Sequence, residues 1–184
     1  MFSVMLDTNI LVDFVLVYLK NEKKERIPPG LIRSNRLLEF YESGNFFNFM
    51  SSWNKFELRD VIMQLKLQQK WVLSGYSVRE FGDAKKEIIL TTKEQDLVNQ
   101  IVFDIWKFSQ RKTVSLVSDD RIQIEKLNKS GFSFMDILLI QQAEKLNCDY
   151  FVTKDTGILN KKNVLSAEFK VKILSLNEFI DKLR

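Results

Sequence analysis

The chain has 184 residues, of which 45% are hydrophobic and 28% are charged, and this composition is typical of one globular domain. It contains no histidine and a single cysteine, which excludes histidine-based catalysis, an intrachain disulfide and a thiolate zinc site. The net charge of +4 permits an anionic partner without requiring one. Any catalysis must therefore rest on carboxylates, lysines, hydroxyl groups or a metal ion held by oxygen atoms.

A lone cysteine, Cys148, is typical of a reducing compartment. Residues 1–4 lack the basic region of a secretory signal, and the apolar run at 10–19 is short and contains Asp13. We therefore expect a cytoplasmic protein that does not contact a membrane.

Short extended segments alternate with helices along the chain. The expected strands are residues 3–6, 46–50, 88–90, 114–117, 150–152 and 171–174. The expected helices are residues 10–20, 31–42, 52–73, 93–112, 118–131, 134–146, 157–161 and 176–183. This alternation predicts an α/β domain with a mostly parallel sheet.

In a parallel sheet, ligands gather beyond the carboxyl ends of the strands, so acidic residues at these ends are candidates for a site. Asp7 directly follows the first strand, and Asp155 comes three residues after the strand at 150–152. Asp136 lies in the first turn of its helix, and Glu57 lies one turn into the helix that leaves the second strand. Each also has a structural interpretation, because strand-end turns, helix caps, helix dipoles and solvated helix faces all favour carboxylates.

The coincidence of four carboxylates near one end of the sheet favours a site. Buried carboxylates lose solvation and repel one another, so a cluster of them is tolerated when a cation neutralises it. Ligands that offer only oxygen suit Mg²⁺ or Mn²⁺ rather than zinc.

Four segments resemble, in order, the motifs of PIN-domain ribonucleases. They are Leu-Asp-Thr-Asn-Ile-Leu at 6–11, Ser-Trp-Asn-Lys-Phe-Glu-Leu at 52–58, Phe-Met-Asp-Ile-Leu-Leu-Ile at 134–140 and Cys-Asp-Tyr-Phe-Val-Thr-Lys-Asp at 148–155. The resemblance implies a three-layer α/β/α fold and a Mg²⁺- or Mn²⁺-dependent endoribonuclease that leaves a 3′-hydroxyl and a 5′-phosphate. It implies a single PIN-like nuclease domain over residues 1–184, with insertions near 21–30 and 112–131. VapC-type members of this family are toxins paired with an antitoxin protein.

The resemblance also assigns roles. Asp7 and Asp136 would bind the metal, and Glu57 and Asp155 would complete its shell directly or through waters, so these four residues are both the metal ligands and the catalytic residues. Three polar neighbours could orient the carboxylates or waters, or could act only as helix caps and turn residues: Thr8, Asn9 and Thr153. One departure concerns positions 157 and 158, where family members often carry another acid and this chain has Gly157 and Ile158.

The expected substrate is single-stranded RNA, because unpaired bases and a flexible backbone can reach a recessed site. Basic residues cluster in three places and could contact its phosphates or could be solvated surface: residues 20–33, Lys85–Lys86 and Arg111–Lys112. The helix at 52–73 is apolar on more than one face, which favours either deep burial or an interface with a second copy or an antitoxin helix.

Two other function classes remain open at this point. A PIN-like module could bind RNA or a protein without cleaving anything, although four intact carboxylates would then have no purpose. An aspartyl-phosphate phosphohydrolase would use Asp7 as its nucleophile, but Asn9 stands where that class has a second aspartate.

Overall fold

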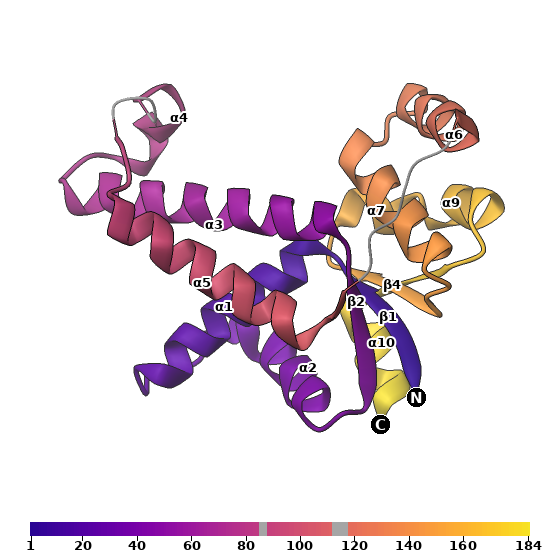
Figure 1. Ribbon diagram of the computed structural model, residues 1–184, viewed down its shortest axis with the longest axis horizontal. Helices are drawn as coiled ribbons and strands as arrows, with labels where there is room; N and C mark the ends of the chain where they lie inside the picture. The colour runs from indigo at the N-terminus through magenta and orange to yellow at the C-terminus, as the bar shows by residue number, and fades with distance from the viewer. Residues whose placement is uncertain (85–87, 112–117) are drawn as a thin grey trace.

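The computed structural model describes residues 1–84, 88–111 and 118–184. Its centre is a parallel sheet with the strand order β3-β2-β1-β4-β5 (Figure 1). The strands are β1 (Phe2–Leu6), β2 (Phe46–Met50), β3 (Gln110–Arg111), β4 (Tyr150–Thr153) and β5 (Lys172–Ser175).

The helices in the described residues alternate with these strands. They are α1 (Thr8–Glu22), α2 (Ile32–Glu42), α3 (Ser52–Leu73), α4 (Phe81–Ala84), α5 (Thr92–Phe108), α6 (Ser118–Lys129), α7 (Phe134–Lys145), α8 (Thr156–Asn160), α9 (Lys162–Glu168) and α10 (Leu176–Leu183), with short 3₁₀ turns at Pro29–Leu31 and Val78–Glu80. None of these helices is long and apolar enough to cross a membrane.

Strand side chains alternate between two hydrophobic cores, one on each face of the sheet. In β1, Val4 and Leu6 pack into a core with α1, α2, α3, α5 and α10, whereas Met5 packs into a core with α6, α7, α8 and α9. In β4, Val152 joins the first core and Phe151 the second. Since a strand's period is two, a buried apolar strand serves both faces. The three-layer α/β/α fold expected from the sequence is confirmed.

The strand order reverses at β1. The chain proceeds from β1 outward through β2 to β3, and then returns to place β4 on the other side of β1. Leu6 pairs with Val152 in register, so the residues that follow these two strands are neighbours. Such a switch point opens a crevice beyond the carboxyl ends of the strands, which is where ligands bind in open α/β sheets.

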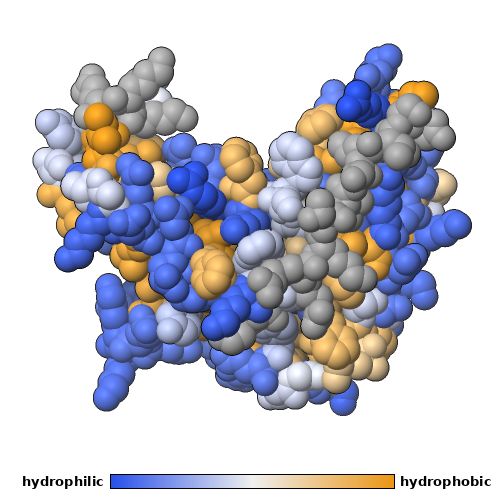
Figure 2. Space-filling view, viewed as in Figure 1, coloured by the Kyte–Doolittle hydropathy of each residue, from blue (hydrophilic) through white to orange (hydrophobic). Residues whose placement is uncertain are grey.

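Helices α3 and α5 pack together and project past the sheet as a helical arm, with α4 at its tip (Figure 1). The 22 residues of α3 span about 33 Å, roughly twice the length of a five-residue strand. On the other side of the carboxyl ends stand α6 and α7, and the surface is hollowed between the two (Figure 2). The site expected at the strand ends therefore lies at the floor of a broad hollow.

Two expectations about the elements need correction. The strand at 88–90 is wrong: residues 88–90 have no regular structure, and the carbonyl groups of Ile89 and Leu90 accept hydrogen bonds from side chains of Lys70 and Gln95. The expected helix at 93–112 ends at Phe108, which leaves two residues for the unpredicted strand β3. Helix α9 was also not predicted, and the expected strand at 114–117 lies outside the described residues.

Candidate functional site

Asp7 is the residue at which β1 passes into α1. Its backbone N–H donates to Val152 O at 2.9 Å, and its side chain is buried. Although Asp7 occupies the N-cap position of α1, its side chain makes no capping hydrogen bond. Its Oδ2 instead accepts hydrogen bonds from Asn9 Nδ2, at 2.7 Å, and from the Thr153 hydroxyl. The carboxylate is therefore turned toward β4 and away from the helix that it begins.

Thr153 connects two of the expected site residues. It is fully buried at the end of β4, and its hydroxyl donates to Asp7 Oδ2. The same hydroxyl oxygen accepts the backbone N–H of Asp155 at 2.9 Å, so its single proton is directed at Asp7. The rotamer of Asp7 and the backbone at Asp155 are thus held by one side chain.

Glu57 reaches the same place from α3. A capping box between Ser51 and Asn54 begins the helix, and Asn54 Nδ2 lies 3.5 Å from Leu6 O, which ties the first turn of α3 to the end of β1. Glu57 lies one turn further along, half-buried, and accepts a hydrogen bond from the Thr8 hydroxyl. The carboxylate of Glu57 is thereby placed beside the start of α1.

Asp136 and Asp155 come from the opposite side of the hollow. Ser133 caps α7 by accepting the backbone N–H of Asp136 at 3.4 Å, and the Asp136 carboxylate is half-buried. Asp155 is exposed and is the N-cap of α8, because its Oδ1 accepts from Ile158 N at 2.9 Å. The capping interpretation of Asp155 is therefore correct, and one of its oxygens is engaged in that role.

The four carboxylates are electrostatic neighbours. Burial raises the pKa of Asp7 from its ordinary value of 3.8 to about 6, the charges of Glu57 and Asp136 add to the shift, and the hydrogen bond from Thr153 opposes it. Burial also raises the pKa of Asp136, together with the charges of Asp155 and Glu57. Ionisation of Asp7 and Asp136 is therefore disfavoured, and a cation placed beside them would relieve this.

The donor set suits a hydrated magnesium or manganese ion rather than a closed protein cage. No three acidic or cysteine side chains among the described residues come close enough together to hold one ion by themselves. Magnesium usually binds through one or two carboxylates and keeps several waters, so a looser carboxylate cluster fits it. Asp7 and Asp136 are the two candidates for direct ligands, since repulsion and burial act most on them.

Gly157 and Ile158, at the positions where the PIN motifs often carry another acid, have structural roles here. A Cβ atom at Gly157 would lie 2.9 Å from Asp155 Oδ1, so a side chain there would push that carboxylate off its helix cap. Ile158 is buried in the core formed with α7 and α9. Neither position could supply a further carboxylate without rearrangement of this corner.

Sequence reasoning missed a buried ion pair behind the site. Asp13 lies on the inner side of α1, accepts a hydrogen bond from the Ser34 hydroxyl and pairs with Lys154 Nζ. Lys154 stands between Thr153 and Asp155, so this pair fastens the β4–α8 connection to α1. The available signal was a single acid within the apolar run at 10–19, which we used only to exclude a membrane span.

The first basic cluster does not border the carboxylates. Lys20 lies about 20 Å along α1 from Asp7, and it pairs with Glu25. Lys85, Lys86, Lys112 and the side chain of Arg111 lie outside the described part of the structure. A basic path to the site therefore stays a prediction.

Comparison with known proteins identifies the fold. No protein-family model matches the sequence, and no curated protein matches it at a significant level. The structure is similar to a chain in the crystal structure of VapBC2 from Rickettsia felis bound to a DNA fragment from their promoter. The match covers 94% of this chain and 98% of that chain, with a TM-score of 0.51 and 14% sequence identity. The fold is thus PIN-like, a parallel sheet between two helical layers.

Proposed function

We propose that the chain is a metal-dependent endoribonuclease that hydrolyses phosphodiester bonds in single-stranded RNA. The observation that carries this proposal is the environment of Asp7, whose carboxylate lies at the switch point of the sheet, where burial, together with the charges of Glu57 and Asp136, raises its pKa to about 6. The four PIN-like motifs and the PIN-like fold support the same function. Cleavage would leave a 3′-hydroxyl and a 5′-phosphate.

In this proposal Asp7 and Asp136 hold the metal, and Glu57 and Asp155 contact it directly or through waters. A bound Mg²⁺ or Mn²⁺ ion supplies an acidified water and offsets charge on the scissile phosphate. The contribution of the chain is to orient the acids. Both side-chain donors to Asp7 meet the same oxygen, Oδ2, which fixes its rotamer.

Polar neighbours act as positioning residues in the same proposal. Thr153 and Asn9 hold Asp7, and Thr8 holds Glu57 by the hydrogen bond from its hydroxyl. Each is set in regular structure at the end of β4 or the start of α1, so little freedom is lost when substrate and metal bind.

The second candidate is a PIN-like module that binds RNA or a protein without cleavage. The raised pKa values of Asp7 and Asp136 count against it, because burial and neighbouring like charges make these ionised carboxylates unfavourable for the fold. A module that only binds would gain nothing from carboxylates that destabilise its fold.

We also propose that the protein acts in the cytoplasm as the toxin of a toxin–antitoxin pair, with a small protein antitoxin as its partner. The likeness of nearly the whole chain to one chain in the VapBC2 crystal structure supports this role. Induced expression should arrest growth, Asp7→Asn should abolish the arrest, and the product of an adjacent small gene should relieve it. Arrest by the Asp7→Asn variant would contradict the nuclease-toxin proposal.

The direct test incubates purified protein with end-labelled single-stranded RNA in Mg²⁺ or Mn²⁺. Wild type should cleave internally, and excess chelator or Asp7→Asn should stop cleavage. Hydrolysis of a phosphate monoester in place of RNA would instead support the phosphohydrolase class. Cleavage that persists in chelator would refute the metal mechanism.

A further inference from the structure

Large aromatic side chains are exposed at the starts of the two helices that carry Glu57 and Asp136. Trp53 and Phe56 at the start of α3 are 41% and 62% exposed, and Phe134 at the start of α7 is 49% exposed. The next apolar residues of α3, Leu58 and Ile62, are buried, and apolar residues are exposed again further along, at Leu65, Val72 and Leu73. The first turns of α3 and α7 therefore present rings to solvent although neighbouring residues on the same helices are buried.

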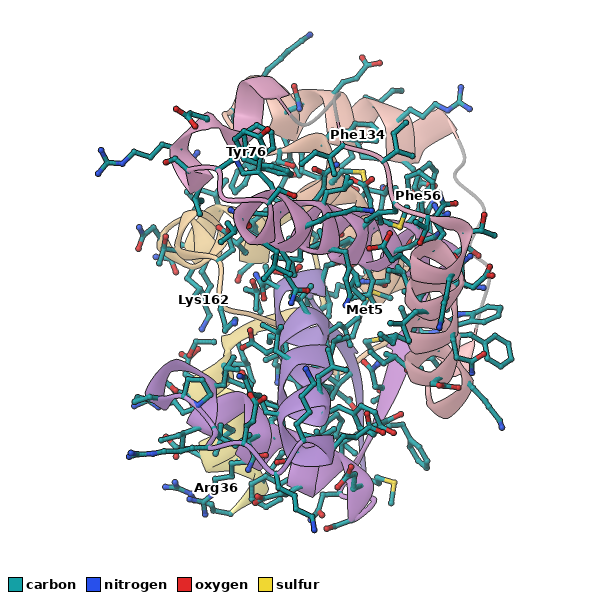
Figure 3. The ribbon with its side chains drawn as sticks, turned by 90° about the vertical axis from the view of Figure 1, so that its left-hand side faces the viewer. Met5, Arg36, Phe56, Tyr76, Phe134 and Lys162 are labelled. Carbon is teal, nitrogen blue, oxygen red and sulfur yellow. The ribbon has the colours of Figure 1, made fainter. Side chains whose placement is uncertain are left out.

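These rings come from the same two helices as Glu57 and Asp136. Phe56 precedes Glu57 directly, and Phe134 lies two residues before Asp136. Figure 3 shows Phe56 and Phe134 at the same end of the molecule, on α3 and α7, and this is the end at which the hollow of Figure 2 opens. Helices α3 and α7 stand on the two sides of that hollow, so the exposed rings at their starts flank it.

The two exposed rings of α3 already contact each other in the protein without a ligand. The rings of Trp53 and Phe56 are in an edge-to-face contact, with centroids 6.5 Å apart and an interplanar angle of 78°. An aromatic pair of this geometry is favourable by itself and limits the rotamers of both side chains. An exposed, preorganised pair can accept a flat ligand at small entropic cost.

We propose that Trp53, Phe56 and Phe134 stack against unpaired nucleobases on the two sides of the phosphate that lies over the carboxylates. This inference rests on the proposed function and names how the substrate is held. A single strand alternates phosphates with flat aromatic bases, so an acidic metal site flanked by rings is complementary to it. In a duplex the base faces are already stacked, so the same rings select single strands.

The test measures affinity without cleavage. In the Asp7→Asn background, binding of a short fluorescent RNA in magnesium buffer is compared for Trp53→Ala, Phe56→Ala and Phe134→Ala. Base stacking on one ring contributes enough that each substitution should weaken binding by at least about fivefold. Trp53→Phe, Phe56→Tyr and Phe134→Tyr keep a ring and should retain most of the affinity.

Two controls separate stacking from a general loss of surface. Phe47→Ala removes a ring that is 47% exposed but lies at the amino end of the sheet, where Phe47 pairs with Ser3, and it should leave affinity unchanged. A strand with abasic sites beside the central phosphate should bind the ring variants and their parent equally. Melting temperatures of all variants should match their parent, since the rings are exposed.

The outcomes distinguish this inference from the nuclease proposal. If wild type cleaves RNA but the ring variants bind normal strands within twofold of their parent, stacking is refuted and cleavage stands. If the ring variants lose affinity equally for normal and abasic strands, the rings do not read bases, and a protein partner is then the better occupant. If stacking is observed but no RNA is cleaved, the nuclease proposal is refuted and the stacking inference is retained.

Discussion

Replacement of Asp7 by asparagine should stabilise the metal-free protein at neutral pH. The folded-state pKa of Asp7 is about 6, against an ordinary value of 3.8. A group that binds its proton more tightly in the folded state makes the free energy of unfolding fall as pH rises between these two values. The loss begins near pH 4 and is complete just above pH 6.

A difference of two pKa units corresponds to about 3 kcal/mol. Asparagine keeps the shape of the side chain, and its carbonyl oxygen can still accept hydrogen bonds from Asn9 and Thr153. In excess chelator, Asp7→Asn should therefore unfold with about 3 kcal/mol more free energy than wild type at neutral pH, or a melting temperature roughly 6–12 °C higher, and should match wild type near pH 3.5. Thermal melts across this pH range measure both the gain and its pH dependence.

Asp13 is the matched control, because it is also a buried aspartate on α1 but is paired with Lys154. Asp13→Asn leaves that ammonium without its partner and should destabilise the protein by roughly 2–3 kcal/mol, less than for a fully buried pair because the lysine side chain is one-third exposed. An Asp7→Asn variant that melts below wild type in chelator, as Asp13→Asn should, would show that Asp7 is a structural cap and that the site is wrongly assigned.

Three further outcomes follow from the same site. Manganese at a hundredfold excess over its dissociation constant should stabilise wild type by about 2.7 kcal/mol in thermal melts, and Asp136→Asn should lose most of this gain; an undiminished gain would exclude Asp136 as a ligand. The metal-induced shift should shrink as pH falls through about 6, since protons compete for Asp7; a constant shift between pH 5 and 7.5 would contradict this. Glu57→Gln keeps an acceptor for Thr8, so its melting temperature in chelator should not fall, whereas RNA cleavage rates should drop at least about 100-fold; near-normal cleavage would remove Glu57 from the site.

Much of the fold could be predicted because its elements are locally encoded. β1, β2 and β4 are apolar runs bounded by polar residues, and the serine at 51 and the serine at 133 both cap helices where the pattern placed them. The failures have physical causes. Two-residue β3 is too short to give a pattern, since it exists through pairing with Phe49 and Met50. The apolar triplet at 88–90 is not a strand, because side chains of α3 and α5 take the hydrogen bonds of its carbonyl groups.

The candidate site was predictable for a different reason. In a parallel sheet, position along the chain determines which acids come to the carboxyl edge, and this places Asp7 and Asp155 without any knowledge of packing. The sequence could not show which way a carboxylate turns. Asp155 caps its own helix through a local contact three residues away, whereas Asp7 turns to Thr153, which is 146 positions away in the chain.

The two buried aspartates of α1 show why burial alone does not mark a functional acid. Asp7 and Asp13 are similarly inaccessible, at 7% and 6% exposure, and lie six residues apart on one helix. Asp13 faces a lysine and a hydroxyl, so its charge is compensated within the fold. Asp7 accepts hydrogen bonds from Asn9 and Thr153, but burial and the charges of Glu57 and Asp136 outweigh them and raise its pKa. The sign of the neighbouring charge therefore separates an acid that stabilises the fold from one whose ionisation the fold opposes, and the second kind is the better candidate for a site.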